Sequence, residues 1–117
     1  MEFTTSSLPI ENEYPKLVRD NIPSIVKNKT GKDIEQRILE TDEEYLKYLF
    51  KKVIEESIEL EHSVVKGNTE EELADICELL NEIIKLKGYT WEEVKLVQNE
   101  KREKNGGFEK RILMLKK

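Results

Sequence analysis

The chain has 117 residues, a length that fits one domain. Its net charge is -5 at pH 7, with 38% charged residues, so it lacks the basic surface that binds a phosphate backbone, and no nucleic acid polymer is expected as a partner. No apolar run is long enough to span a membrane, so we expect no membrane partner either. The single cysteine, Cys77, excludes a disulfide framework and indicates a reducing compartment, the cytoplasm.

The first residues differ in character from the rest of the chain. Residues 1–13 include two Thr, two Ser and one Pro residue and are expected to form a flexible arm, whereas residues 14–117 are expected to form the domain. A first, short helix should begin near Asp20 or Asn21, because either residue is a good helix cap and Pro23 is tolerated in a first turn.

Two long amphipathic helices are expected next, over about residues 42–66 and 69–87. The second of them has the cleaner apolar stripe, and Cys77 lies on that stripe, so we expect Cys77 in the core. Gly67 separates the two helices, and a glycine can close a helix in the left-handed conformation. A connection this short makes the two helices natural antiparallel partners.

A fourth helix is expected over about residues 91–104, where Lys101 continues the apolar stripe that begins at Val94. Two short stretches, residues 34–38 and 108–114, alternate in polarity and would suit a small two-stranded ribbon. The predicted fold class is therefore all-α, an antiparallel helical bundle of about four helices, with or without that ribbon.

Two helix starts carry a capping-box pattern, and a third, "NTEEE" (residues 68–72), offers Asn68 with Glu71 or Thr69 with Glu72. Thr41 is followed three residues later by Glu44, and Thr90 is followed three residues later by Glu93. In such a box the threonine hydroxyl accepts a hydrogen bond from a backbone N–H, and the glutamate reaches back to the N–H of the cap.

Acidic residues gather on the two long helices. Glu56 and Glu59 are three residues apart, as are Glu72 and Asp75, and Glu55 lies one turn before Glu59. In an antiparallel pair both sets would meet at one end, where crowded carboxylates need a counter-charge. Magnesium favours such oxygen ligands, whereas no calcium loop or zinc-ligand cluster is present. The alternative is an ordinary solvated helix face.

The order of four motifs resembles a known family. "EESIE" (residues 55–59) and "ELAD" (residues 72–75) are similar to the EExxE…ExxD signature of the all-α nucleoside triphosphate pyrophosphohydrolases, the MazG-like superfamily, which includes phosphoribosyl-ATP pyrophosphohydrolase. "YPKLVRDNIP" (residues 14–23) resembles the family's opening, and "KREKNGGFEKRI" (residues 101–112) resembles its basic close. The resemblance covers about residues 14–115.

This resemblance implies magnesium-dependent hydrolysis between the α- and β-phosphates of a nucleoside triphosphate, with manganese as a substitute for magnesium. By position, Glu56, Glu59, Glu72 and Asp75 would be the metal ligands. Glu55 and Glu56 would be the catalytic carboxylates, and Glu55 would support the ligands, bind an additional ion or orient the attacking water. No protein nucleophile is required, because a metal ion can activate water.

Basic residues near the two ends of the domain are candidates for binding the substrate phosphates: Lys101, Lys104, Arg102, Lys16 and Arg19. Each could equally serve the surface charge of a helix end. Two further functions stay open, namely phosphoribosyl-ATP hydrolysis in histidine biosynthesis and a non-catalytic helical oligomer that binds a nucleotide. Short amphipathic helices leave apolar area uncovered, so a homodimer or homotetramer is expected.

Overall fold

The computed structural model describes residues 14–117, and the expected arm over residues 1–13 lies outside this part. The chain forms four helices: α1 (Ile22–Thr30), α2 (Asp42–Lys66), α3 (Thr69–Leu86) and α4 (Trp91–Asn105). The all-α prediction is confirmed. No helix in residues 14–117 has both the length and the apolar character needed to cross a bilayer.

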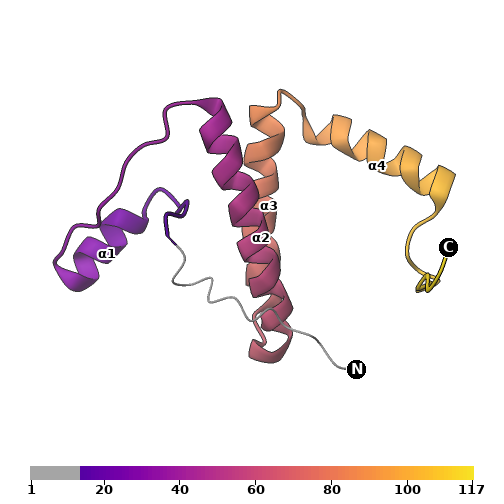
Figure 1. Cartoon of the computed structure of the whole chain (residues 1–117), viewed down its shortest axis with the longest axis horizontal. Helices are drawn as coiled ribbons and strands as arrows, with labels where there is room; N and C mark the ends of the chain where they lie inside the picture. The colour runs from indigo at the N-terminus through magenta and orange to yellow at the C-terminus, as the bar shows by residue number, and fades with distance from the viewer. Residues whose placement is uncertain (1–13) are drawn as a thin grey trace.

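The expected ribbon does not form, since the part of the chain that is described contains no strand. Residues 34–38 belong to the connection between α1 and α2, whereas residues 108–114 belong to the tail after α4. These two segments lie on opposite sides of the α2–α3 pair (Figure 1), which is why they cannot pair within one chain.

Helices α2 and α3 lie side by side and antiparallel, and they form the packed centre of the molecule (Figure 1). Gly67 ends α2 with φ 82°, in the left-handed region, and its N–H donates to the Ser63 carbonyl oxygen at 2.7 Å. The core between the helices is small: Leu49 is 1% exposed and Ile84 is 9% exposed. The predicted antiparallel pair is therefore present, with little apolar volume inside it.

Polar contacts tie the pair together at both ends. Near the turn, the Ser63 hydroxyl is fully buried, lies 2.6 Å from the Leu60 carbonyl oxygen and is hydrogen-bonded to the Thr69 hydroxyl at 3.0 Å. At the other end, the Tyr45 hydroxyl donates to a carboxylate oxygen of Glu82 at 3.1 Å. These contacts fix the register of α2 against α3, because buried polar groups must meet their partners.

The helix caps follow the sequence in part. Thr90 and Glu93 form the full capping box at the start of α4. Thr41 accepts a hydrogen bond from the Glu44 N–H, but the Glu44 carboxylate binds Arg37 instead of reaching back to the cap. The Arg37 guanidinium offers two charge-assisted hydrogen bonds, which are stronger than the single bond that completes a box.

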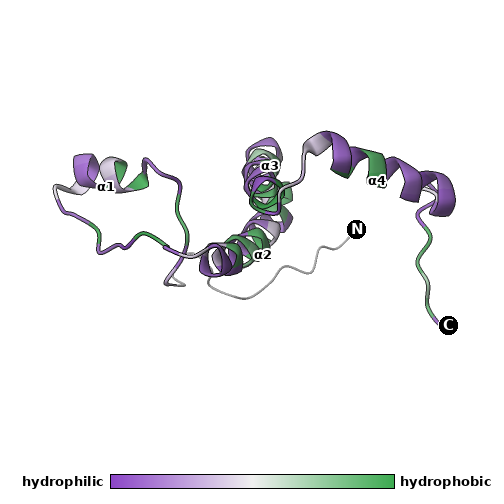
Figure 2. Ribbon diagram, turned by 90° about the horizontal axis from the view of Figure 1, so that it is seen from above, coloured by the Kyte–Doolittle hydropathy of each residue, from purple (hydrophilic) through white to green (hydrophobic). Residues whose placement is uncertain are grey.

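The outer helices leave much apolar surface open. Helices α1 and α4 lie on opposite sides of the α2–α3 pair, and the tail carries hydrophobic residues away from it (Figure 2). The prediction of a core position for Cys77 is wrong, because Cys77 is exposed. In residues 14–117 no other helix is packed along the α3 face on which it lies.

Candidate metal centre

Three carboxylates converge between the two central helices. Glu56 comes from α2, and Glu72 and Asp75 come from the first turns of α3. Each offers one oxygen, and the three oxygens lie within 4.8 Å of one another. The helical spacing of three residues places Glu72 and Asp75 on one face, and the short turn at Gly67 brings that face to Glu56.

Glu72 is held at the helix start by a neighbouring side chain. The Asn68 amide donates to Glu72 Oε1 at 3.3 Å, in place of capping the helix. The second oxygen, Glu72 Oε2, is buried without a protein hydrogen-bond donor among residues 14–117, and so is Asn68 Oδ1. A buried acceptor left without a donor costs about 1–3 kcal/mol, so this position favours a proton or a cation.

The electrostatic environment of Glu56 also favours a proton or a cation at the cluster. Burial raises the pKa of Glu56 to about 7, and the neighbouring carboxylates of Glu72 and Asp75 act in the same direction. The ammonium of Lys52 opposes this rise in pKa. The three carboxylates therefore relieve their repulsion either by holding a proton on Glu56 or by sharing a positive ion.

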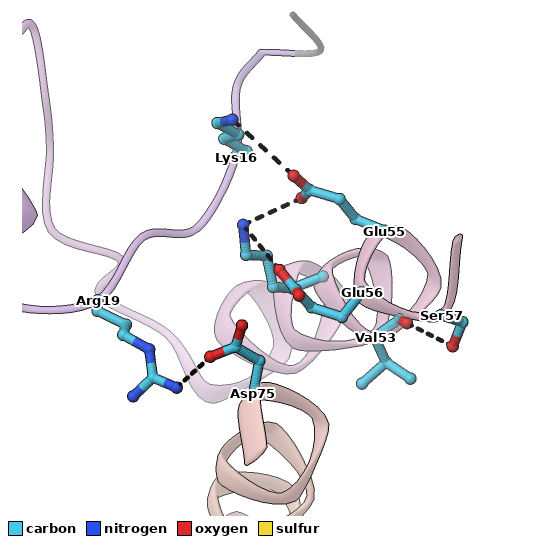
Figure 3. Close-up of polar contacts among 8 residues, drawn as sticks. Lys16, Arg19, Val53, Glu55, Glu56, Ser57 and Asp75 are labelled. Atoms are coloured by element: carbon cyan, nitrogen blue, oxygen red, sulfur yellow. Dashed lines mark hydrogen bonds and ion pairs between the residues drawn. The ribbon is translucent and has the colours of Figure 1, made fainter. Parts of the chain in front are cut away.

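Basic side chains surround the cluster, and one of them was missed in the sequence. Lys52 lies 3.1 Å from Glu55 Oε2 and 3.7 Å from Glu56 Oε1. Its spacing of three and four residues before these glutamates was a readable signal, because such pairs face each other on a helix. Lys16 and Arg19 reach the same region from the segment before α1 (Figure 3), with Arg19 binding Asp75 at 2.6 Å.

Glu55 and Glu59 stand outside the triad that the three converging oxygens form. Glu55 lies between two ammonium groups, with Lys16 at 3.8 Å and Lys52 at 3.1 Å. Glu59 lies 4.0 Å from Lys66, about two turns further along α2. Of the four expected metal ligands, the structure thus brings three together and leaves Glu59 directed to a lysine.

The candidates for phosphate binding divide into two groups. Lys16 and Arg19 lie at the cluster, as described, whereas Lys101, Arg102 and Lys104 lie on α4. Helix α4 follows the C-terminal end of α3 and extends away from the central pair, but Glu72 and Asp75 lie near the opposite end of α3 (Figure 1). One chain therefore does not bring the α4 residues to the carboxylates, and Arg102 is paired with Glu109.

The donor set fits a small hard cation. Magnesium takes six oxygen ligands and retains several waters, so three carboxylate oxygens would leave positions for water or other oxygen ligands. Neither sulfur nor imidazole takes part in the cluster, which argues against zinc or a softer metal. Comparisons of the chain with protein-family models, with curated proteins and with solved structures find no match.

Proposed function

We propose that this protein is a magnesium-dependent nucleoside triphosphate pyrophosphohydrolase, which gives a nucleoside monophosphate and pyrophosphate. The observation that carries the proposal is the convergence of Glu56, Glu72 and Asp75 from two helices to within 4.8 Å. The buried, undonated oxygen of Glu72 supports it, because that atom favours a cation. The motif order resembling the MazG-like superfamily supplies the reaction type.

In this proposal each carboxylate has a distinct task. Glu56, Glu72 and Asp75 hold the ion, with manganese as a substitute for magnesium. The bound ion would supply positive charge that shields the phosphates and lowers the pKa of water. Glu55 is fixed between Lys16 and Lys52 and would orient the attacking water. Asn68 keeps Glu72 in place through its amide.

Pyrophosphate release tests the proposal directly. A panel of ribonucleoside, deoxyribonucleoside and modified triphosphates, together with phosphoribosyl-ATP, would be assayed with and without magnesium. Glu56→Gln and Asp75→Asn should each lower kcat/KM by about 100-fold or more, because each removes negative charge that holds the ion, and the ion stabilises the transition state. Circular dichroism should show helical content close to that of the wild type.

Glu71→Gln is the matched control, since Glu71 lies beside Glu72 in the same turn, is exposed and is no part of the triad. Equal activity loss in Glu71→Gln and Glu56→Gln would contradict the assigned site. Turnover of phosphoribosyl-ATP alone would place the enzyme in histidine biosynthesis. Metal and nucleotide binding without turnover of any substrate would favour the non-catalytic helical oligomer.

The assembled form is proposed to be a homodimer or homotetramer working in the cytoplasm. Large apolar side chains are exposed on α2, on α3 and on the tail, among them Ile54 at 61%, Leu73 at 48% and Phe108 at 96%. A second copy would cover these surfaces. The second copy could also bring its Lys101 and Lys104 to the carboxylates of the first, because within one chain these lysines lie far from the triad.

A further inference from the structure

A short basic segment, residues 16–19, runs past Glu55, Glu56 and Asp75 from a part of the chain remote in sequence (Figure 3). Its two charged residues bind different carboxylates. Arg19 Nη2 lies 2.6 Å from Asp75 Oδ1, which belongs to the triad. Lys16 Nζ lies 3.8 Å from Glu55 Oε1, which does not.

The two contacts also differ in exposure. The side chains of Arg19 and Asp75 are 59% and 37% exposed, whereas those of Lys16 and Glu55 are 22% and 16% exposed. An exposed ion pair contributes little net free energy and is broken easily. The contact to the triad is therefore shorter but more open to solvent and to exchange with other ions, whereas the contact at Lys16 is longer and more protected.

We propose that Arg19 is an exchangeable counter-cation of the metal centre: it binds Asp75 in the metal-free protein, and it moves to a phosphate oxygen of the nucleotide once a divalent ion occupies Asp75. Lys16 stays on Glu55 and keeps the segment beside the site during the exchange. The inference rests on the proposed function and gives Arg19, a candidate for phosphate binding, a second partner that it leaves when the ion binds.

Three physical reasons support the exchange. A divalent ion at Asp75 brings two positive charges close to the guanidinium, and their repulsion weakens the Arg19 contact. The guanidinium fork fits a phosphate as well as a carboxylate, so Arg19 can keep charge-assisted hydrogen bonds after it moves. The move is short, because a nucleotide whose phosphates contact the same ion must lie next to Asp75.

The decisive experiment compares two affinities in Arg19→Gln and the wild type. Mn²⁺ alone would be titrated and followed by electron paramagnetic resonance, and pyrophosphate would be titrated by calorimetry at saturating Mg²⁺. Arg19→Gln should bind Mn²⁺ about two- to fivefold more tightly, because the competing guanidinium is gone. The free energy of an exposed ion pair corresponds to no larger change in affinity. It should bind pyrophosphate more weakly, because a phosphate ligand is lost. A purely structural role for Arg19 would weaken both.

Arg37→Gln is the matched control for the loss of one positive charge. Arg37 is 63% exposed and binds Glu44 at 2.7 Å, away from the triad. It should change neither affinity, and Arg19→Lys should keep the Mn²⁺ affinity near the wild-type value. Unchanged Mn²⁺ affinity in Arg19→Gln, while the wild type binds Mn²⁺, would overturn the exchange and leave the proposed function standing. A wild type that binds no Mn²⁺ would overturn both.

Discussion

Glu56 is the residue on which the chemistry of the cluster depends most. It faces two carboxylates of α3 across the helix interface, and its side chain is 12% exposed. Burial is the main reason that its pKa rises to about 7. A glutamate in this state exchanges a proton for a cation near neutral pH, so metal affinity is expected to increase as the pH rises.

Without metal, the free energy of unfolding should decrease as the pH rises from about 4.5 to about 7, as far as Glu56 determines it. The folded state favours the protonated form, so this contribution is complete below the unfolded pKa and is lost as the pH passes the folded pKa. Denaturant titrations at several pH values, with chelator present, would measure this trend.

Glu56→Gln provides the comparison, because glutamine stays neutral throughout and keeps a similar shape. The stability difference between wild type and Glu56→Gln should grow in favour of the variant as the pH rises. Added Mg²⁺ should stabilise the wild type more than the variant, since the ion binds the ionised carboxylate. If the stability of the two proteins changed with pH in parallel, the folded state would not raise the pKa of Glu56.

The residues that sequence patterns placed well are those whose position depends on neighbours in the same helix or hairpin. Glu56, Glu72 and Asp75 met as predicted because helical spacing and one short turn determine where they lie. Arg19 and Lys16 were candidates for phosphate binding, but their contacts to Asp75 and Glu55 join residues far apart in the chain. No local pattern specifies such contacts, and so only the folded chain reveals them.

For the helices, the sequence predicts where each one begins and ends, but not which apolar faces another helix covers. The bounds Asp42–Lys66 of α2 agree with the sequence, because Thr41 and Gly67 mark them chemically. The same patterns say which face of a helix is apolar, but they do not say what covers it. Cys77 was placed in the core for this reason, and it is exposed.

Gly67 offers a test of the turn that brings the triad together. Gly67→Ala should destabilise the protein by about 1–2 kcal/mol, because an L-residue with a side chain is strained in the left-handed conformation. No atom lies within 4 Å of the added Cβ, so the cost is in the backbone and not in a clash. Thermal or chemical unfolding followed by circular dichroism would measure it.

Gly67→Asn is the matched variant, since asparagine tolerates the left-handed region better than alanine. It should lose less stability than Gly67→Ala. If the alanine variant were as stable as the wild type, the left-handed turn at φ 82° would not describe the protein in solution.

The whole molecule exposes far more surface than its mass requires. Its accessible area is 10507 Å², whereas a compact protein of 13.8 kDa exposes about 6,600 Å². Stable interfaces bury about 1,200–2,000 Å² in total, so the excess is large enough for one or more contacts between copies. Leu49 and Ile84 are the buried apolar residues of the described part, and so small a core needs additional burial.

The melting temperature should therefore rise with protein concentration, as it does when association stabilises the folded state. Sedimentation velocity over the same concentrations should show a species of two or four chains. Phe108→Ser should lower both the assembled fraction and the melting temperature, because Phe108 is 96% exposed in one chain and would be covered in the assembly. A monomer with a concentration-independent melting temperature would contradict the proposed assembly.

The packing of α2 against α3 alone also has a kinetic consequence. These helices follow each other in sequence across Gly67 and Asn68, so most close contacts of the molecule join residues that are near in the chain. Folds with mostly local contacts form fast, because little loop entropy is lost before contacts are gained. The hairpin, together with its three carboxylates, should thus form in an early unimolecular phase, and a slower second-order phase should follow when chains meet.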